Sequence, residues 1–148
     1  TFWSQVAPSY LGQKVAIIGS DQPQNFNCLQ NKDSYHFISN IKDSLREAKG
    51  LGFVISTILQ QYYDIIILEL TKSKETNLGL IALAEEYIKD KGKVIINGDN
   101  QIGVKSFLKN ISNHWPVEKT MVKKKGRIAI YKKKNKNLAT GKNIKIFI

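Results

Sequence analysis

The chain has 148 residues, is 42% hydrophobic and carries a formal net charge of +11. This length predicts one domain with a core of its own. No apolar run approaches the roughly 20 residues of a membrane span, the N-terminus has no secretory signal, and a single cysteine, Cys28, excludes a disulfide framework. We expect a cytoplasmic protein without membrane contact.

The excess positive charge is confined to the end of the chain. Residues 119–148 hold ten Lys, one Arg and no acidic residue, whereas residues 1–118 hold 12 basic and 12 acidic groups. A basic segment of this kind is typical of a nucleic-acid-binding surface, and also of a solvated, solubilising tail. Composition leaves both interpretations open.

The first part of the chain predicts three strands and one helix. Short apolar runs predict strands at 14–20 and 53–58, and the alternation of Phe26 and Cys28 with polar residues predicts a weaker strand at 25–30. Apolar residues recur at three- and four-residue steps from Phe37 to Ala48, which predicts a helix capped by Asp33 or Ser34.

The second part of the chain continues the alternation of predicted strands and helices. Three consecutive isoleucines within 62–70 predict a strand buried on both faces, as in a parallel sheet covered by helices. A helix is predicted with its apolar face over 80–88 and its end at "KGK" (91–93), followed by a strand from Val94 and a helix from Gly103 that ends before Pro116. Two extended stretches on either side of Lys125 and Gly126 predict an antiparallel hairpin.

These elements together predict a three-layer, Rossmann-like α/β fold with a mostly parallel sheet and a C-terminal antiparallel hairpin. We expect one α/β domain over residues 1–134, and a basic linker or extension over residues 135–148. The chain begins with Thr1 and not with Met, which indicates a fragment of a longer protein.

The motifs of nucleotide and metal sites are missing from the sequence. The first predicted strand ends in Gly19 followed by "SDQPQN", with neither the second glycine nor the helix start of a dinucleotide or adenosyl-cofactor turn. There is no P-loop and no Gly-x-Ser-x-Gly, and no ligand spacing links His36, His114 and Cys28. We therefore predict no catalytic residue and no metal site, with surface or half-buried histidines and Cys28 as a core thiol in a strand.

The stretch "KVIINGDNQIGVKS" (93–106) has the strand–glycine–helix order of a nucleotide-binding turn. We interpret it structurally: Gly98 ends a strand, and Asp99 or Asn100 orders the turn through side-chain to backbone hydrogen bonds. Asp99 has no neighbouring carboxylate or histidine in sequence that would tune it for acid–base catalysis.

Several spaced motifs between residues 62 and 134 resemble the N-terminal domain of bacterial 16S ribosomal RNA guanine-N2 methyltransferases, of the class I "methyltransferase small" type. That family shows a "DxxLxxxPKxK" strand, a "GxNxxGVxS" turn and a basic "GRxxxY/F" strand, in this order. The matching positions are Asp64, Lys72, Ser73, Lys74, Gly98, Asn100, Gly103, Val104, Ser106, Gly126, Arg127 and Tyr131.

The resemblance implies a duplicated parent protein whose catalytic domain follows Ile148. In this family the C-terminal domain carries the S-adenosylmethionine loop and an Asn-Pro-Pro motif, and neither occurs here. "LELTKSK" stands where Asn-Pro-Pro would lie, and Thr71 replaces the proline of the N-terminal pattern. The resemblance therefore implies a methyltransferase-like domain that binds no cofactor itself, in a parent enzyme that uses S-adenosylmethionine.

The expected partners are ribosomal RNA or the small ribosomal subunit, and the catalytic domain of the same protein. Tyr131 either stacks on an unpaired base or belongs to the core. Two alternatives stay open: a stand-alone small methyltransferase with its cofactor at the Gly98 turn, and a protein-interaction domain with a solubilising lysine tail. The predicted RNA-binding residues, which would neutralise phosphates, are Lys123, Lys124, Lys125, Arg127, Lys132, Lys133 and Lys134.

Overall fold

The computed structural model describes residues 13–99, 103–112, 115, 117–122 and 126–132. Its strands are β1 (Val15–Ile18), β2 (Tyr35–Ile38), β3 (Val54–Ser56), β4 (Tyr63–Glu69), β5 (Ile88–Asp99), β6 (Val117–Val122) and β7 (Gly126–Lys132). Its α-helices are α2 (Lys42–Leu51), α3 (Lys74–Tyr87) and α4 (Val104–Ser112), and two 3-10 helices are η2 (Pro23–Phe26) and η3 (Lys32–Ser34).

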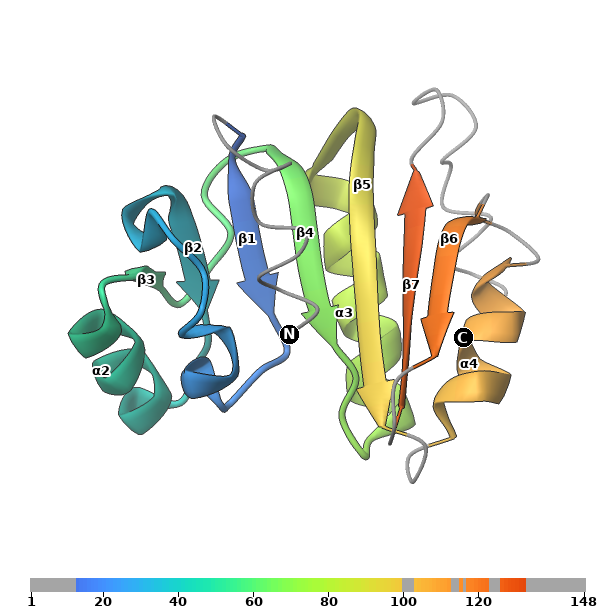
Figure 1. The fold of residues 1–148 in the computed structure, drawn as a ribbon, viewed down its shortest axis with the longest axis horizontal. Helices are drawn as coiled ribbons and strands as arrows, with labels where there is room; N and C mark the ends of the chain where they lie inside the picture. Colours follow the sequence, from blue (N-terminus) through green and yellow to red (C-terminus); the bar gives the residue numbers. More distant parts are fainter. Residues whose placement is uncertain (1–12, 100–102, 113–114, 116, 123–125, 133–148) are drawn as a thin grey trace.

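The seven strands form one sheet in the order β3-β2-β1-β4-β5-β7-β6, with helices on both faces (Figure 1). The pairs from β3 to β5 are all parallel, whereas β7 runs antiparallel to both of its neighbours, β5 and β6. This confirms the predicted α/β fold, its mostly parallel sheet and its C-terminal hairpin. None of the helices in the described part of the chain is long and apolar enough to cross a bilayer.

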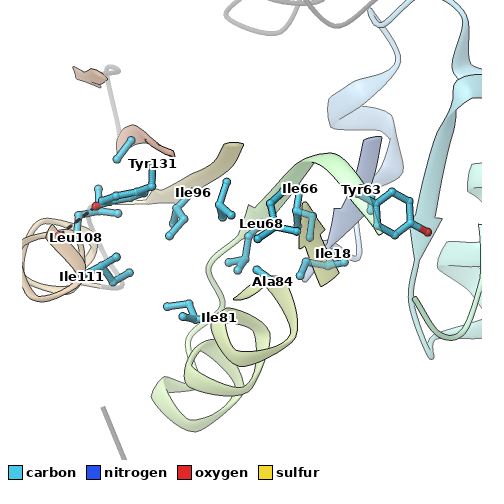
Figure 2. Close-up of a cluster of buried hydrophobic side chains, with 14 of the residues drawn as sticks. Ile18, Tyr63, Ile66, Leu68, Ile81, Ala84, Ile96, Leu108, Ile111 and Tyr131 are labelled. Carbon is cyan, nitrogen blue, oxygen red and sulfur yellow. Dashed lines mark hydrogen bonds between the residues drawn. The ribbon is translucent and has the colours of Figure 1, made fainter. Parts of the chain in front are cut away.

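The central strands are buried on both faces, as their isoleucines predict. Ile66 and Leu68 of β4 belong to the core on the side of α3 and α4, whereas Ile65 and Ile67 belong to the core on the opposite side. Figure 2 shows the first of these cores, in which Ile81 and Ala84 of α3 point toward the sheet and Leu108 of α4 lies beside Tyr131 of β7. The sheet and the two helices thus hold the hairpin firmly in place.

The region between residues 25 and 48 differs from the sequence prediction. The predicted strand at 25–30 is wrong, because η2 and a turn occupy this region, and Cys28 is exposed instead of being a core thiol. Asp33 and Ser34 lie in η3 and cap no α-helix, since the strand β2 follows directly.

The predicted helix from Phe37 begins only at Lys42. Phe37 packs into one core and Ile38 against the other, which is the two-residue period of a strand. Pairing of β2 with both β1 and β3 outweighs the helical spacing of the apolar residues around it.

Two connections of the sheet carry no α-helix. The chain between β1 and β2 forms only η2 and η3, and the crossover from β3 to β4, residues 57–62, has neither helix nor strand. A parallel crossover usually carries a helix that covers the sheet. Among the described residues, no helix therefore covers the sheet beside α3, at the carboxyl ends of β1, β2 and β3.

Candidate functional site

A cavity of about 840 Å³ opens at the carboxyl ends of β1, β2 and β4. The strand order reverses between β1 and β4, and open α/β sheets bind their ligands at such a point. The charged residues that line the cavity are Asp21, Glu69, Lys72 and Asp99. The cavity lies where related folds bind a cofactor. Whether it can bind one depends on the polar groups that the loops around it offer.

The loop after β1 is closed by contacts within the protein. A Cβ atom added at Gly19, whose φ is +81°, would lie 2.5 Å from the carbonyl oxygen of Glu69 and 2.8 Å from Leu80 Cδ1. The glycine is therefore required for packing against the end of β4 and against α3. The next residues lead into η2, and the Ser44 hydroxyl of α2 donates a hydrogen bond to the Asp21 carbonyl at 3.0 Å.

No α-helix starts in this loop, so it does not offer the row of free backbone N–H groups found at the cofactor turn of dinucleotide-binding folds. The second glycine and the helix start that such a turn needs are replaced by a 3-10 turn. The cavity therefore lacks its usual anion-binding wall within residues 13–99, the part of the sheet that the structure describes without a gap.

The loop after β4 is also satisfied internally. Buried Asn77 accepts hydrogen bonds from the Thr71 backbone N–H at 2.7 Å and from the Thr71 hydroxyl at 2.9 Å, and it donates to the Thr71 carbonyl at 3.0 Å. Ser73 caps α3 by accepting from the Thr76 N–H at 3.1 Å. The polar groups of this loop thus bind one another and fix the conformation of the loop. Asn77 is not among the residues predicted from the sequence, where its only signal is a polar residue on the buried side of α3.

The motif residues of this loop lie at the cavity rim and on α3. Lys72 lines the cavity and is exposed, Ser73 is the helix cap, and Lys74 is the first residue of α3. Of the two lysines, Lys72 lines the cavity and Lys74 does not.

The turn after β5 shows close packing of glycines. A Cβ atom at Gly98 would lie 2.5 Å from Val104 Cγ2, and one at Gly126 would overlap the Gly98 carbonyl oxygen on the paired strand. Gly103 adopts a φ of +72° immediately before α4, and Ser106 is exposed on that helix. Asn100 lies outside the described residues. These contacts join β5, β7 and α4.

The predicted RNA-binding residues are distributed along the hairpin. Lys132 is exposed at the end of β7, whereas Arg127 near its start is half-buried and its Nε atom is buried. Lys123, Lys124, Lys125, Lys133 and Lys134 lie outside the described residues. Stacking of Tyr131 on a base is wrong, because its side chain is 1% exposed and its hydroxyl donates a hydrogen bond to the Leu108 carbonyl at 3.1 Å.

His36 is half-buried on β2, two residues before Ile38, which lines the cavity. Its Nδ1 atom and the Tyr63 hydroxyl are 2.8 Å apart, and the rings meet edge to face. Burial, reinforced by the charge of Lys14, lowers the pKa of His36, and burial raises the pKa of Tyr63. In the described parts of the chain, no three His, Cys, Asp or Glu side chains gather in a group that could hold a metal ion.

The family of the chain follows from its sequence match. Residues 8–140 match the model of the methyltransferase small domain N-terminal family. The chain belongs to this family. It is thus a methyltransferase-like domain, and a comparison with curated protein sequences finds no match.

The fold is shared with solved methyltransferases. The 16S rRNA N2 G1207 methyltransferase of T. thermophilus, solved with AdoMet and guanosine, is similar at a TM-score of 0.68 and 13% identity, over 91% of this chain and 39% of that one. The ribosomal protein L11 methylase of Lactobacillus delbrueckii subsp. bulgaricus gives 0.64 and 13%, over 90% and 78%. The pre-rRNA processing fibrillarin of Methanococcus jannaschii gives 0.60 and 12%, over 83% and 67%.

Proposed function

We propose that this domain is a non-catalytic accessory domain of an S-adenosylmethionine-dependent rRNA guanine-N2 methyltransferase, and that it helps to hold the RNA. The observation that carries the proposal is the closed loop after β1, where Gly19 packs against Glu69 and Leu80 and a 3-10 turn replaces the cofactor-binding helix start. This favours a domain that keeps the methyltransferase fold and binds no cofactor. It argues against a stand-alone methyltransferase.

The parent protein is the proposed source of catalysis. This chain spans 39% of the length of the structurally similar T. thermophilus rRNA methyltransferase, which leaves room for a second domain in a protein of that size. We propose that the parent's catalytic domain binds S-adenosylmethionine, acts in rRNA processing in the cytoplasm, and places the guanine of the small-subunit RNA.

Charge supports the RNA-binding role. The chain carries a net charge of +11, and residues 119–148 hold 11 of its basic groups and no acidic one. Each Lys or Arg that neutralises a phosphate releases counterions and makes the affinity depend on salt. About five such contacts predict a log–log salt slope of roughly −3.5 to −4.5.

The test is the affinity of the 148-residue chain for a fluorescently labelled small-subunit rRNA hairpin, measured by anisotropy across a salt series from about 50 to about 200 mM. We expect binding that weakens along this series with the slope given above. Absence of binding at low salt, or an affinity that does not change with salt, would overturn the RNA-binding role.

Contact with another domain is a second candidate, favoured by apolar side chains at the cavity mouth. Ile41, Ile58 and Leu83 line the cavity and are 47%, 63% and 41% exposed. In the parent protein the catalytic domain is the partner that we propose. Ile58→Ser with Leu83→Ser should then expand the parent protein in small-angle X-ray scattering while RNA binding by the isolated domain stays unchanged; an unaltered scattering profile would reject this contact.

A further inference from the structure

The strand β7 separates the predicted RNA-binding residues into two groups. In sequence, Lys123, Lys124 and Lys125 come directly before its first residue, and Lys133 and Lys134 come directly after its last. Its seven residues span about 20 Å. Because β7 runs antiparallel to β5, it starts at the carboxyl ends of the parallel strands and ends at their amino ends. The two ends therefore present separate surfaces.

The charge balance of the described residues differs between the amino edge and the lining of the cavity. We define the amino edge by the charged residues at the amino ends of β1, β4, β5 and β6 and at the end of β7. Five of them are basic and three are acidic: Lys14, Lys89, Lys91, Lys93 and Lys132, with Asp64, Asp90 and Glu118. The cavity at the carboxyl ends has the opposite balance, with Asp21, Glu69 and Asp99 against Lys72.

Two ion pairs fix part of the amino edge. Lys89 Nζ lies 3.3 Å from Asp64 Oδ1, and Lys93 Nζ lies 3.1 Å from Glu118 Oε1. Asp64 also accepts a hydrogen bond from the Lys14 backbone N–H at 2.8 Å. Two of the three acidic groups are thus engaged with specific partners. Among the described residues, the ammonium groups of Lys14, Lys91 and Lys132 take part in no ion pair and are available to a ligand.

The local backbone presents these lysines to solvent. The register of β5 against β4 shifts between Ile88 and Lys93, and within this shift exposed Lys91 adopts a left-handed φ of +65°. A non-glycine residue in this conformation costs energy, and such strain clusters at functional positions. The irregular segment directs a lysine out of the regular ladder near the amino end of β4, where Lys91 lines a shallow depression with Asp64 and Asp90.

Lys93 and Lys132 lie directly opposite each other on the antiparallel pair β5 and β7. Side chains in this relation project from the same face of the sheet, and like charges there destabilise the pair. The ion pair with Glu118 offsets the positive charge of Lys93. A phosphate group between the ammonium groups would relieve the remaining repulsion.

We infer that the amino edge holds the RNA phosphate backbone, with Lys91 and Lys132 as the contacts. The inference rests on the proposed RNA-binding function and assigns it to one edge of the sheet. The lining of the cavity, with three acidic residues and one lysine, is less favourable to phosphates. The contacts are electrostatic, so they position RNA without reading its bases.

The test compares three double variants of the 148-residue chain on the same labelled hairpin. K91Q/K132Q removes two of the three lysines of the amino edge that take part in no ion pair among the described residues, K123Q/K125Q removes two charges before β7, and K42Q/K49Q removes two exposed charges from α2 as a matched control. Thermal melts verify that all three fold. Lys89 and Lys93 are kept, because their ion pairs contribute to the structure.

We expect K91Q/K132Q to weaken binding about tenfold and to reduce the magnitude of the salt slope by about 1.4 to 1.8, as the loss of two phosphate contacts requires. The other two variants should stay within about threefold of the original affinity. If K123Q/K125Q weakens binding as much or more, the assignment to the amino edge is overturned while RNA binding stands. If the original chain shows no salt-dependent binding, the proposed function and the inference both fail.

Discussion

Replacement of Gly98 by alanine tests whether the turn after β5 is maintained by packing. The new Cβ would lie 2.5 Å from Val104 Cγ2 and 3.0 Å from Leu70 Cδ1, closer than the 3.4 Å at which ordinary contact begins. Val104 is fully buried in the first turn of α4, and its branched side chain has little rotamer freedom in a helix. The helix or the strand must therefore move.

Overpacking of this kind costs about 1–3 kcal/mol. A chain of this size loses about 3 °C of melting temperature per kcal/mol, so we expect Gly98→Ala to lower the melting midpoint by about 3–9 °C. Circular dichroism at 222 nm provides the measurement, and urea unfolding gives the free energy independently.

The matched control is Gly79→Ala in α3, where an added Cβ meets no atom within 4 Å. Alanine at an open helix position should stabilise the fold by about 0.5–1 kcal/mol. An unchanged or higher melting midpoint for Gly98→Ala would refute the packing explanation. Binding of a ligand at the turn would then be the alternative reason for a glycine at this position.

Three further variants test other parts of the structure. Burial lowers the pKa of His36, so as the pH drops below about 6.5 the unfolded chain binds more protons than the folded one and the folded state loses stability. His36→Gln should therefore lose less melting temperature than the original chain between about pH 7.5 and about pH 5.5. An identical loss in both proteins would contradict this. Tyr131→Phe removes the hydrogen bond to the Leu108 carbonyl and should lower the free energy of unfolding in urea by about 1 kcal/mol. The same variant should bind RNA with unchanged affinity, and a weaker affinity would support contact of Tyr131 with RNA. Asn77→Ala removes three hydrogen bonds to Thr71 and should cost about 2–3 kcal/mol in the same assay; a loss below about 0.5 kcal/mol would show that solvent replaces this network.

The elements with a clear apolar period could be predicted from the sequence. The isoleucines of β4, the apolar face of α4 and the alternation of Ile128 and Ala129 in β7 all describe burial directly, and the structure confirms them. Residues 35–48 could not be resolved in this way. There a strand and a helix follow each other so closely that Phe37 and Leu45 fall at helical spacing by coincidence.

The sites depend on strand order and direction, which local patterns do not contain. The sequence shows basic residues on both sides of β7, but only the antiparallel pairing of β7 with β5 shows that the start and the end of this strand lie at opposite edges of the sheet. The sequence predicts a helix end at Lys91 and a strand only from Val94, because the bulge that extends β5 back to Ile88 has no sequence signature. The network of Asn77 with Thr71 likewise requires the three-dimensional approach of a helix to a loop.

The central claim is that this domain keeps the methyltransferase fold and does not bind the cofactor. Isothermal titration calorimetry of the 148-residue chain with S-adenosylmethionine tests it most directly. We predict no heat of binding at protein and ligand concentrations that would reveal a micromolar dissociation constant. A saturable isotherm with one site per chain and micromolar affinity would contradict the account.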